Sequence, residues 1–251
     1  MSGHSHWATI KRKKGAADAK KGQIFTRHAR EIVMAAREGG GDIDSNVRLQ
    51  LAIERARSQN MPKDNIERAI KRGTGENKDG IILEQLYYEG YANHGVALMI
   101  EVVTDNRNRA VAEIRHALSR NGGALGESGS VAWQFKRAAY YALPAAGNDP
   151  DKIFELAVEA GADDVIFDEE VIEITGPAEN FKTISDALRK TGLKPDEAEL
   201  RMFPNQEMEL NVSETLQVMR TIEALEELDD VHNVFSNLKF TEEALATLES
   251  D

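Results

Sequence analysis

The sequence predicts an α+β protein in which an N-terminal three-helix module is followed by two ferredoxin-like α/β domains, one inserted into the other. Three observations lead to this class. Apolar residues recur at helical spacing through residues 23–72. A polar, glycine-rich stretch at residues 73–80 then interrupts any apolar period and reads as a linker. Beyond the linker, strand-like and helix-like runs follow one another in an order that twice gives β-α-β-β-α-β.

The helical module is predicted from three amphipathic segments. The first covers about residues 23–38 and ends at three consecutive glycines, which stop a helix because each glycine costs about 1 kcal/mol there. The second covers about residues 46–59, and Asp44 or Ser45 is its expected cap. The third begins near Pro62, since proline suits the first turn of a helix.

The body beyond the linker is predicted to mix strands and helices. An Asn93-His94-Gly95 turn separates the first two strands. The expected strands cover residues 83–90, 96–103, 131–135, 139–143, 165–168, 171–175, 199–203, 208–212 and 231–235. The expected helices cover residues 107–120, 150–160, 178–190 and 213–228.

One complete β-α-β-β-α-β series lies within residues 137–204, and the elements on either side of it form a second series. We therefore expect one domain to be inserted into a hairpin turn of the other, because exposed turns tolerate such insertions. The predicted parts are a flexible basic arm at residues 1–21, a helical domain at 22–75, a discontinuous α/β domain at 80–136 plus 205–240, and an inserted ferredoxin-like domain at 137–204.

Charge is distributed unevenly along the chain. Residues 1–75 hold 16 Lys+Arg against 8 Asp+Glu, a net charge of +8, whereas residues 76–251 hold 15 against 35, a net charge of −20. The whole protein therefore carries a net charge of −12. Such asymmetry indicates that the basic N-terminal part, residues 1–75, binds a polyanion. The alternative is a solvated lysine-rich tail that has no partner.

The candidate nucleic-acid-binding residues begin with an aromatic side chain beside a run of cations. The first group is Trp7, Lys11, Arg12, Lys13 and Lys14. Lys20, Lys21, Arg27 and Arg30 extend the positive surface onto the first predicted helix. The indole of Trp7 can stack on a base, a contact worth about 1–3 kcal/mol, or pack on the helical module, and the sequence leaves both open.

Arg107 and Arg109 form a second candidate anion site. They stand at the start of a predicted helix, where the dipole disfavours cations by about 0.3–1 kcal/mol. An anion that binds to the helix N-terminus and to both guanidinium groups would explain why two arginines stand there. The alternative is an internal ion pair with Asp105 or Glu113.

Several classes of function are disfavoured. The chain has no cysteine, which excludes disulfides and zinc–thiolate sites and fits a reducing compartment, so we expect a cytoplasmic protein. We expect no signal peptide and no membrane insertion, because no apolar run approaches the ~20 residues of a spanning helix. His4 and His6 lack a third ligand nearby, and the glycine-rich loop at 122–129 lacks the Gly-Lys-Ser/Thr ending of a phosphate loop. We therefore expect no enzyme activity, no metal, no cofactor and no small-molecule substrate.

Several motifs, in this order, resemble the YebC family. They are Gly3-His4-Ser5, Trp7-Ala8, Ile10-Lys11, residues 18–22, Ile24-Phe25-Thr26, residues 64–70 and residues 104–109. Together they run from residue 3 to residue 109, and the resemblance extends over the whole chain. It implies three domains, of which the middle one is discontinuous in sequence.

The resemblance also implies a function. Members of the family are described as probable DNA-binding transcriptional regulatory proteins, whereas related proteins are translational activators or act on ribosomes paused at proline runs. The expected partner is therefore nucleic acid, either promoter DNA or ribosomal RNA, and the ribosome itself is a further candidate. The residues do not decide between DNA and RNA. A protein-interaction scaffold is the second alternative.

Overall fold

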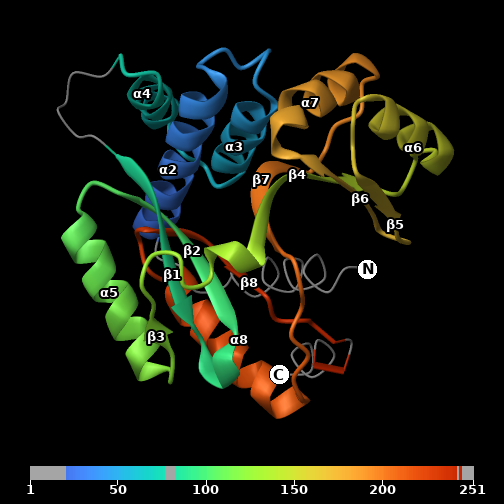
Figure 1. Cartoon of the computed structure of the whole chain (residues 1–251). Coiled ribbons are helices and arrows are strands. Elements are labelled where there is room, and N and C mark those ends of the chain that lie inside the picture. Colours follow the sequence, from blue (N-terminus) through green and yellow to red (C-terminus); the bar gives the residue numbers. More distant parts are fainter. Residues whose placement is uncertain (1–20, 77–82, 242, 245–251) are drawn as a thin grey trace. The chain divides into compact units, whose positions relative to one another are not determined.

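The structure is a computed structural model that describes residues 21–76, 83–241 and 243–244 (Figure 1). These residues divide into two compact units. The first unit contains residues 24–76 and 137–201, and the second unit contains residues 83–136 and 202–244. Each unit is described by itself below. The predicted arm up to residue 20 lies outside the described residues.

The first unit begins with three helices, as predicted. They are α2 (Lys21–Gly39), α3 (Val47–Ser58) and α4 (Lys63–Gly73). Their apolar faces form the core of the module, in which Ile32, Met34, Leu49 and Ile53 are fully buried. The end of α4 lies directly on α2, because a Cβ built on Gly73 would come within 2.6 Å of the carbonyl oxygen of Val33. Only glycine allows this close approach of two backbones.

Asn46 fixes the connection between α2 and α3. Its side-chain oxygen accepts a hydrogen bond from the backbone N–H of Leu49 at 3.0 Å and so caps α3. Its amide group donates to the carbonyl oxygens of Ala35 and Gly40, both at 2.8 Å. The expectation that Asp44 or Ser45 caps this helix is therefore wrong. The buried side chain of Asn46 thus supplies hydrogen-bond partners for backbone carbonyl groups at the end of α2 and for a backbone N–H group in the first turn of α3.

We expect Asn46→Ala to lower the free energy of unfolding of the first unit by about 2 kcal/mol, because it removes a cap and leaves buried backbone groups unsatisfied. Ser45→Ala is the matched control. The Ser45 hydroxyl is exposed and bonds only to Asp42, so its loss should cost less than about 0.5 kcal/mol. Urea unfolding of both variants provides the test, and equal losses would show that Asn46 is not the cap.

Residues 137–201 of the first unit supply most of a four-stranded sheet and two helices. The strands are β4 (Phe135–Pro144), β5 (Asp164–Phe167), β6 (Val171–Pro177) and β7 (Glu197–Pro204). Their order in the sheet is β5-β6-β4-β7, and β6 pairs antiparallel with both β5 and β4. Helices α6 (Pro150–Glu159) and α7 (Phe181–Lys190) cover one face. The predicted β-α-β-β-α-β order is confirmed, except that residues 178–180 form the short 3-10 helix η3 (Ala178–Asn180) before α7.

The helical module and this sheet contact each other within the first unit. Val47 and Leu51 of α3 pack against the core of the sheet and its helices. Arg55 donates a hydrogen bond to the carbonyl oxygen of Asp196 at 2.8 Å and pairs with Glu31 at 2.9 Å. These contacts join segments that are far apart in sequence. The division into a helical domain and a separate inserted domain stays a prediction.

The second unit contains the other sheet, with strands in the order β3-β1-β2-β8. The strands are β1 (Glu84–Tyr91), β2 (Ala97–Thr104), β3 (Ala124–Leu125) and β8 (Val231–Ser236). β2 pairs antiparallel with β1 and with β8, and β1 pairs antiparallel with β3. Every residue of β2 is buried.

Helices α5 (Arg107–Arg120) and α8 (Val212–Glu226) pack on the face of β2 that carries Leu98, Ile100 and Val102. Ala97 and Met99 contact a smaller apolar cluster that contains Val131 and Phe135. β2 is thus the central strand of this unit.

Two predicted strands of this unit are wrong. Residues 131–135 contain the 3-10 helix η2 (Ala132–Gln134), and residues 208–212 contribute only one isolated bridge, from Met208 to Leu238. The reason is that β1 occupies the position beside β2, since the 93–95 turn closes a hairpin that pairs all eight residues of both strands. A short strand that was not predicted, β3, extends the sheet on the other side of β1.

Within the described residues, no helix is long and apolar enough to cross a membrane.

Candidate nucleic-acid interface

The predicted arm contributes most of the candidate binding residues, and most of these lie outside the described residues. This applies to Trp7, Lys11, Arg12, Lys13, Lys14 and Lys20. Lys21 is the first residue of α2. The assignment of these residues to nucleic-acid binding stays a prediction.

The first turns of α2 present positive charge. The first turn contains no acidic residue, Arg27 is exposed, and Arg30 is half-buried one turn further on. Because the N-terminus of a helix carries a partial positive charge, a nearby anion is stabilised by the backbone N–H groups and by cationic side chains together. The described start of α2 therefore carries cationic side chains and no acidic residue in its first turn, and its role in phosphate binding stays a prediction.

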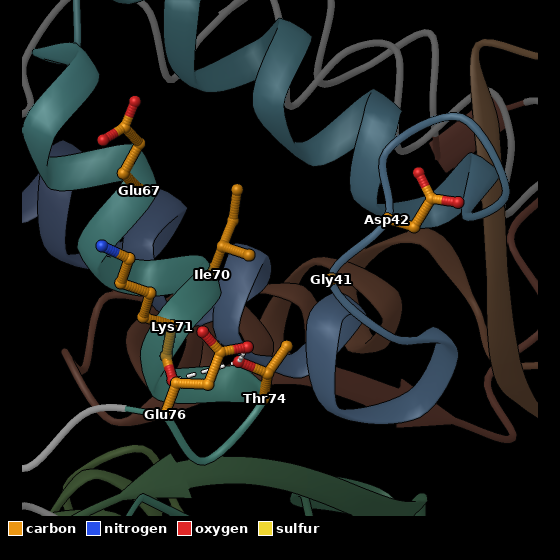
Figure 2. A pocket seen from close by; sticks show the side chains of 7 residues that line it. All are labelled: Gly41, Asp42, Glu67, Ile70, Lys71, Thr74 and Glu76. Atoms are coloured by element: carbon orange, nitrogen blue, oxygen red, sulfur yellow. Dashed lines mark hydrogen bonds between the residues drawn. The ribbon is translucent and has the colours of Figure 1, made fainter.

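A cleft of about 420 Å³ lies at the opposite end of the helical module (Figure 2). It is lined by Gly41, Asp42, Glu67, Ile70, Lys71, Thr74 and Glu76. Figure 2 shows Glu67 and Lys71 on α4, and the Thr74 hydroxyl donates to the carboxylate of Glu76 at 3.0 Å. Three carboxylates against one ammonium group repel phosphate, so we do not place nucleic acid in this cleft.

Arg107 lies at the first position of α5 and is 63% exposed. Its guanidinium group pairs with the carboxylate of Glu84, which is also well exposed. Surface pairs of this kind contribute about 0–1 kcal/mol, so an incoming phosphate competes with a weak internal partner.

Arg109 is held more firmly. Its guanidinium group bonds to both carboxylate oxygens of Asp230, at 2.8 and 3.0 Å, and to Asp105 at 2.9 Å. Asp230 is only 2% exposed and also accepts from the Thr104 hydroxyl at 2.9 Å. Hydrogen bonds to Asp230 raise the pKa of Arg109 above its ordinary value. The expected internal partner Asp105 is confirmed, whereas the main partner, Asp230, was not anticipated. A role of Arg107 and Arg109 in nucleic-acid binding stays a prediction.

The loop at residues 126–134, which we call the tryptophan loop, is fastened by one buried carboxylate. Glu89 of β1 is 8% exposed and accepts hydrogen bonds from the backbone N–H groups of Gly129, Val131 and Ala132 at 2.6–2.8 Å. Burial alone would raise the pKa of Glu89, but these three bonds outweigh burial and hold the pKa below its usual value. The carboxylate is therefore ionised at neutral pH and fixes the loop.

Sequence reasoning placed Trp133 in a strand and assigned no role to Glu89 or Asp230. One local signal pointed to a turn instead, namely the Ser128-Gly129-Ser130 segment before Val131. Gly129 has a φ of +87°, a conformation that glycine adopts without strain. The partners of Glu89 and Asp230 lie about 40 and 121 residues away in sequence, so no short motif could reveal them.

In the part of the chain that the structure describes, no group of three or more His, Asp or Glu side chains is arranged to hold a metal ion. His4 and His6 lie outside that part.

Two family models match the chain. Residues 5–76 match a model described as the TACO1/YebC protein N-terminal domain, and residues 83–238 match one described as the TACO1/YebC second and third domain. The gap between the two matches, residues 77–82, overlaps the second half of the predicted linker at residues 73–80.

Individual relatives match over the full length. A "Probable transcriptional regulatory protein" from Acidithiobacillus ferrooxidans is 50% identical over 250 residues, which cover 100% of this chain and 99% of the relative. A protein with the same description from Geotalea uraniireducens is 47% identical over 98% of both chains. The crystal structure of a conserved hypothetical protein from Aquifex aeolicus is similar with a TM-score of 0.76 at 40% identity, and the match covers 90% of this chain and 93% of that one.

Proposed function

The chain belongs to the TACO1/YebC family, and from this premise we propose that it is a non-enzymatic nucleic-acid-binding regulator of gene expression. The names of its relatives, probable transcriptional regulatory proteins, support a regulatory role. The observation that carries nucleic-acid binding is the charge of the N-terminal part, +8 over residues 1–75 in a protein of net charge −12.

The proposed contact surface is the run Lys11-Arg12-Lys13-Lys14 together with the start of α2. At physiological salt the Debye length is about 8 Å, so the acidic body does not cancel these charges at a distance. The acid-free first turn of α2 and the exposed guanidinium group of Arg27 continue the positive surface. Phosphate groups of DNA or RNA are the matching anions.

A salt titration of binding tests this proposal. Each phosphate that a cation neutralises adds about 0.7–0.9 to the slope of log affinity against log salt. Replacing residues 11–14 with glutamine should therefore flatten the slope by roughly 3 units, for every nucleic-acid sequence tested, because phosphate contacts do not read sequence.

The matched control replaces four exposed lysines of the first unit with glutamine and so changes the net charge equally. These are Lys152, Lys182, Lys190 and Lys194. The control should keep the slope of the wild-type protein. Equal flattening in both variants would show that only the overall charge matters, and an unchanged slope in the variant of residues 11–14 would show that the run does not bind phosphate. Running the titration with duplex DNA and with RNA identifies the preferred nucleic acid.

A further inference from the structure

Among the described residues of the second unit, Trp133 is the aromatic side chain that is largely exposed. It is 73% exposed, although tryptophan is mostly buried in folded proteins. Its indole Nε1–H donates to the carbonyl oxygen of Ser130 at 3.1 Å, within the tryptophan loop. This bond fixes one edge of the ring and uses its only donor, so the ring offers an external partner an apolar aromatic surface.

The backbone that carries Trp133 is held from two sides. Glu89 binds three backbone N–H groups of the loop, and its own carbonyl oxygen accepts from the N–H of Gly126 at 2.8 Å. The side-chain amide of Asn205 donates to the carbonyl oxygen of Trp133 at 3.0 Å, and the backbone N–H of Asn205 donates to that of Gln134 at 2.7 Å. A ring presented by a fixed backbone loses little conformational entropy when a partner binds.

The surroundings of Trp133 distinguish between kinds of partner. A protein contact is usually centred on several apolar side chains that exclude water together. Among the described residues, the other large exposed apolar side chains are Ile43, Phe154, Val158, Ile166 and Phe167, and all of them belong to the first unit. The described part of the second unit thus has no other large apolar side chain as exposed as Trp133. Its aromatic neighbour is the half-buried Tyr91, whose hydroxyl donates to the same Ser130 carbonyl oxygen at 3.1 Å.

Local charge also permits an anionic partner. Residues 128–134 carry no charge, although the protein has a net charge of −12. The exposed side chain of Lys136 follows three residues after Trp133, while the nearest acidic residue in the loop is the exposed Glu127. Aromatic side chains on which bases stack are typically accompanied by cations that contact the nucleic-acid backbone, and Lys136 is such a cation close in sequence to Trp133.

We propose that Trp133 stacks on an unpaired base of the nucleic acid that this protein binds, an inference that rests on the proposed function. A base inside a duplex has both faces covered by its neighbours, so this contact requires a single-stranded or looped segment. The ligand class is thus unpaired nucleotides, and the preference for an unpaired segment comes from the second unit, outside the basic arm.

The fluorescence of Trp133 tests the inference directly. The sequence contains two tryptophans, so Trp7→Phe leaves Trp133 as the only one. The probes are a mixed-sequence single-stranded RNA of about 12 nucleotides and a blunt duplex of the same sequence, each with a terminal dye for anisotropy. We expect the single-stranded probe to quench the emission of Trp133 and to protect the ring from acrylamide, whereas the duplex does neither.

Variants give the size of the effect. Trp133→Ala should weaken binding of the single-stranded probe about tenfold, because stacking on one base contributes about 1–3 kcal/mol, and the slope against salt should stay unchanged. Trp133→Phe keeps an aromatic ring and should recover most of the affinity. Binding of the probe with unchanged Trp133 emission would overturn this inference alone and would assign the ring to another partner. Absence of binding to both of these probes and to the duplex DNA of the salt titration would overturn the proposed function and this inference with it.

Discussion

Glu89→Gln is expected to lower the free energy of unfolding of the second unit by about 2–4 kcal/mol. The carboxylate accepts three backbone hydrogen bonds through its two oxygens. Glutamine replaces one oxygen with an NH₂ group, which leaves buried N–H groups facing another donor, and each unsatisfied group costs about 1–3 kcal/mol. Urea unfolding measures the loss, and hydrogen exchange should accelerate at the amides of Gly129, Val131 and Ala132.

The loss of stability caused by Glu89→Gln is expected to depend on pH. Because the pKa of Glu89 is lower in the folded protein than its ordinary value of 4.5, the ionised carboxylate stabilises the fold at every pH above that value. This contribution is lost as pH falls below 4.5 and through the lowered pKa of the folded state. The difference in stability between the wild-type protein and Glu89→Gln should therefore be constant near neutral pH and shrink in acid.

Glu127→Gln is the control, since Glu127 belongs to the same loop but is exposed. It should change stability by less than about 0.5 kcal/mol. A loss in Glu89→Gln no larger than in this control would mean that the three hydrogen bonds do not hold the tryptophan loop.

Arg109→Gln is expected to destabilise the second unit by about 2–3 kcal/mol. The change removes the guanidinium group that pairs with the buried carboxylate of Asp230, a carboxylate that also accepts from the Thr104 hydroxyl. Removing one member of a buried ion pair costs about 3–5 kcal/mol, and we expect less here because Arg109 itself is 43% exposed. The helix dipole alone would make this change neutral or slightly stabilising, and the loss of the pair with Asp230 outweighs that effect.

Arg107→Gln separates this structural role from nucleic-acid binding. Both arginines lie in the first turn of α5. Among the described residues Arg107 pairs with Glu84 at the surface, so the loss of Arg107 should cost at most about 1 kcal/mol. If Arg107 contacts a phosphate, the slope of log affinity against log salt should fall by about 1 unit without loss of stability. Equal destabilisation by both changes would contradict the assignment of Asp230 as the buried partner.

The helices of this protein were predictable because their signals are local. The three glycines after residue 38 end α2, and the apolar period of residues 107–120 gives α5 with the bounds that were expected. The sheet of the first unit was also predictable, since β4, β5 and β6 each contain a short apolar run between turn signals. These features depend on residues within one or two turns of each other.

The second sheet was predicted less well because its arrangement depends on competition between strands. Residues 131–135 and 208–212 have strand-like composition, but the hairpin of β1 and β2 closes over only a few residues and takes the position beside β2. A short loop costs less conformational entropy to close than a long connection. Sequence patterns indicate which residues tend to form a strand, but they do not determine which strands pair with one another.

The candidate nucleic-acid interface was likewise predictable only in its local features. A run of cations such as residues 11–14 is visible in the sequence, and so is the charge asymmetry that makes it informative. The exposure of Trp133 is not, because it depends on a carboxylate about 40 residues earlier and on Asn205, 72 residues later. Likewise, the buried partner of Arg109 lies 121 residues away.

The central position of β2 has a consequence for synthesis of the chain. β2 is buried along its whole length and pairs with β1 on one side, but 126 residues separate its end from the start of its other neighbour, β8. At about 5–20 residues per second, a ribosome needs roughly 6–25 seconds to make that segment. Throughout this interval the nascent chain has an apolar strand with an unpaired edge, which is the kind of surface that chaperones bind and that aggregates if it is left uncovered.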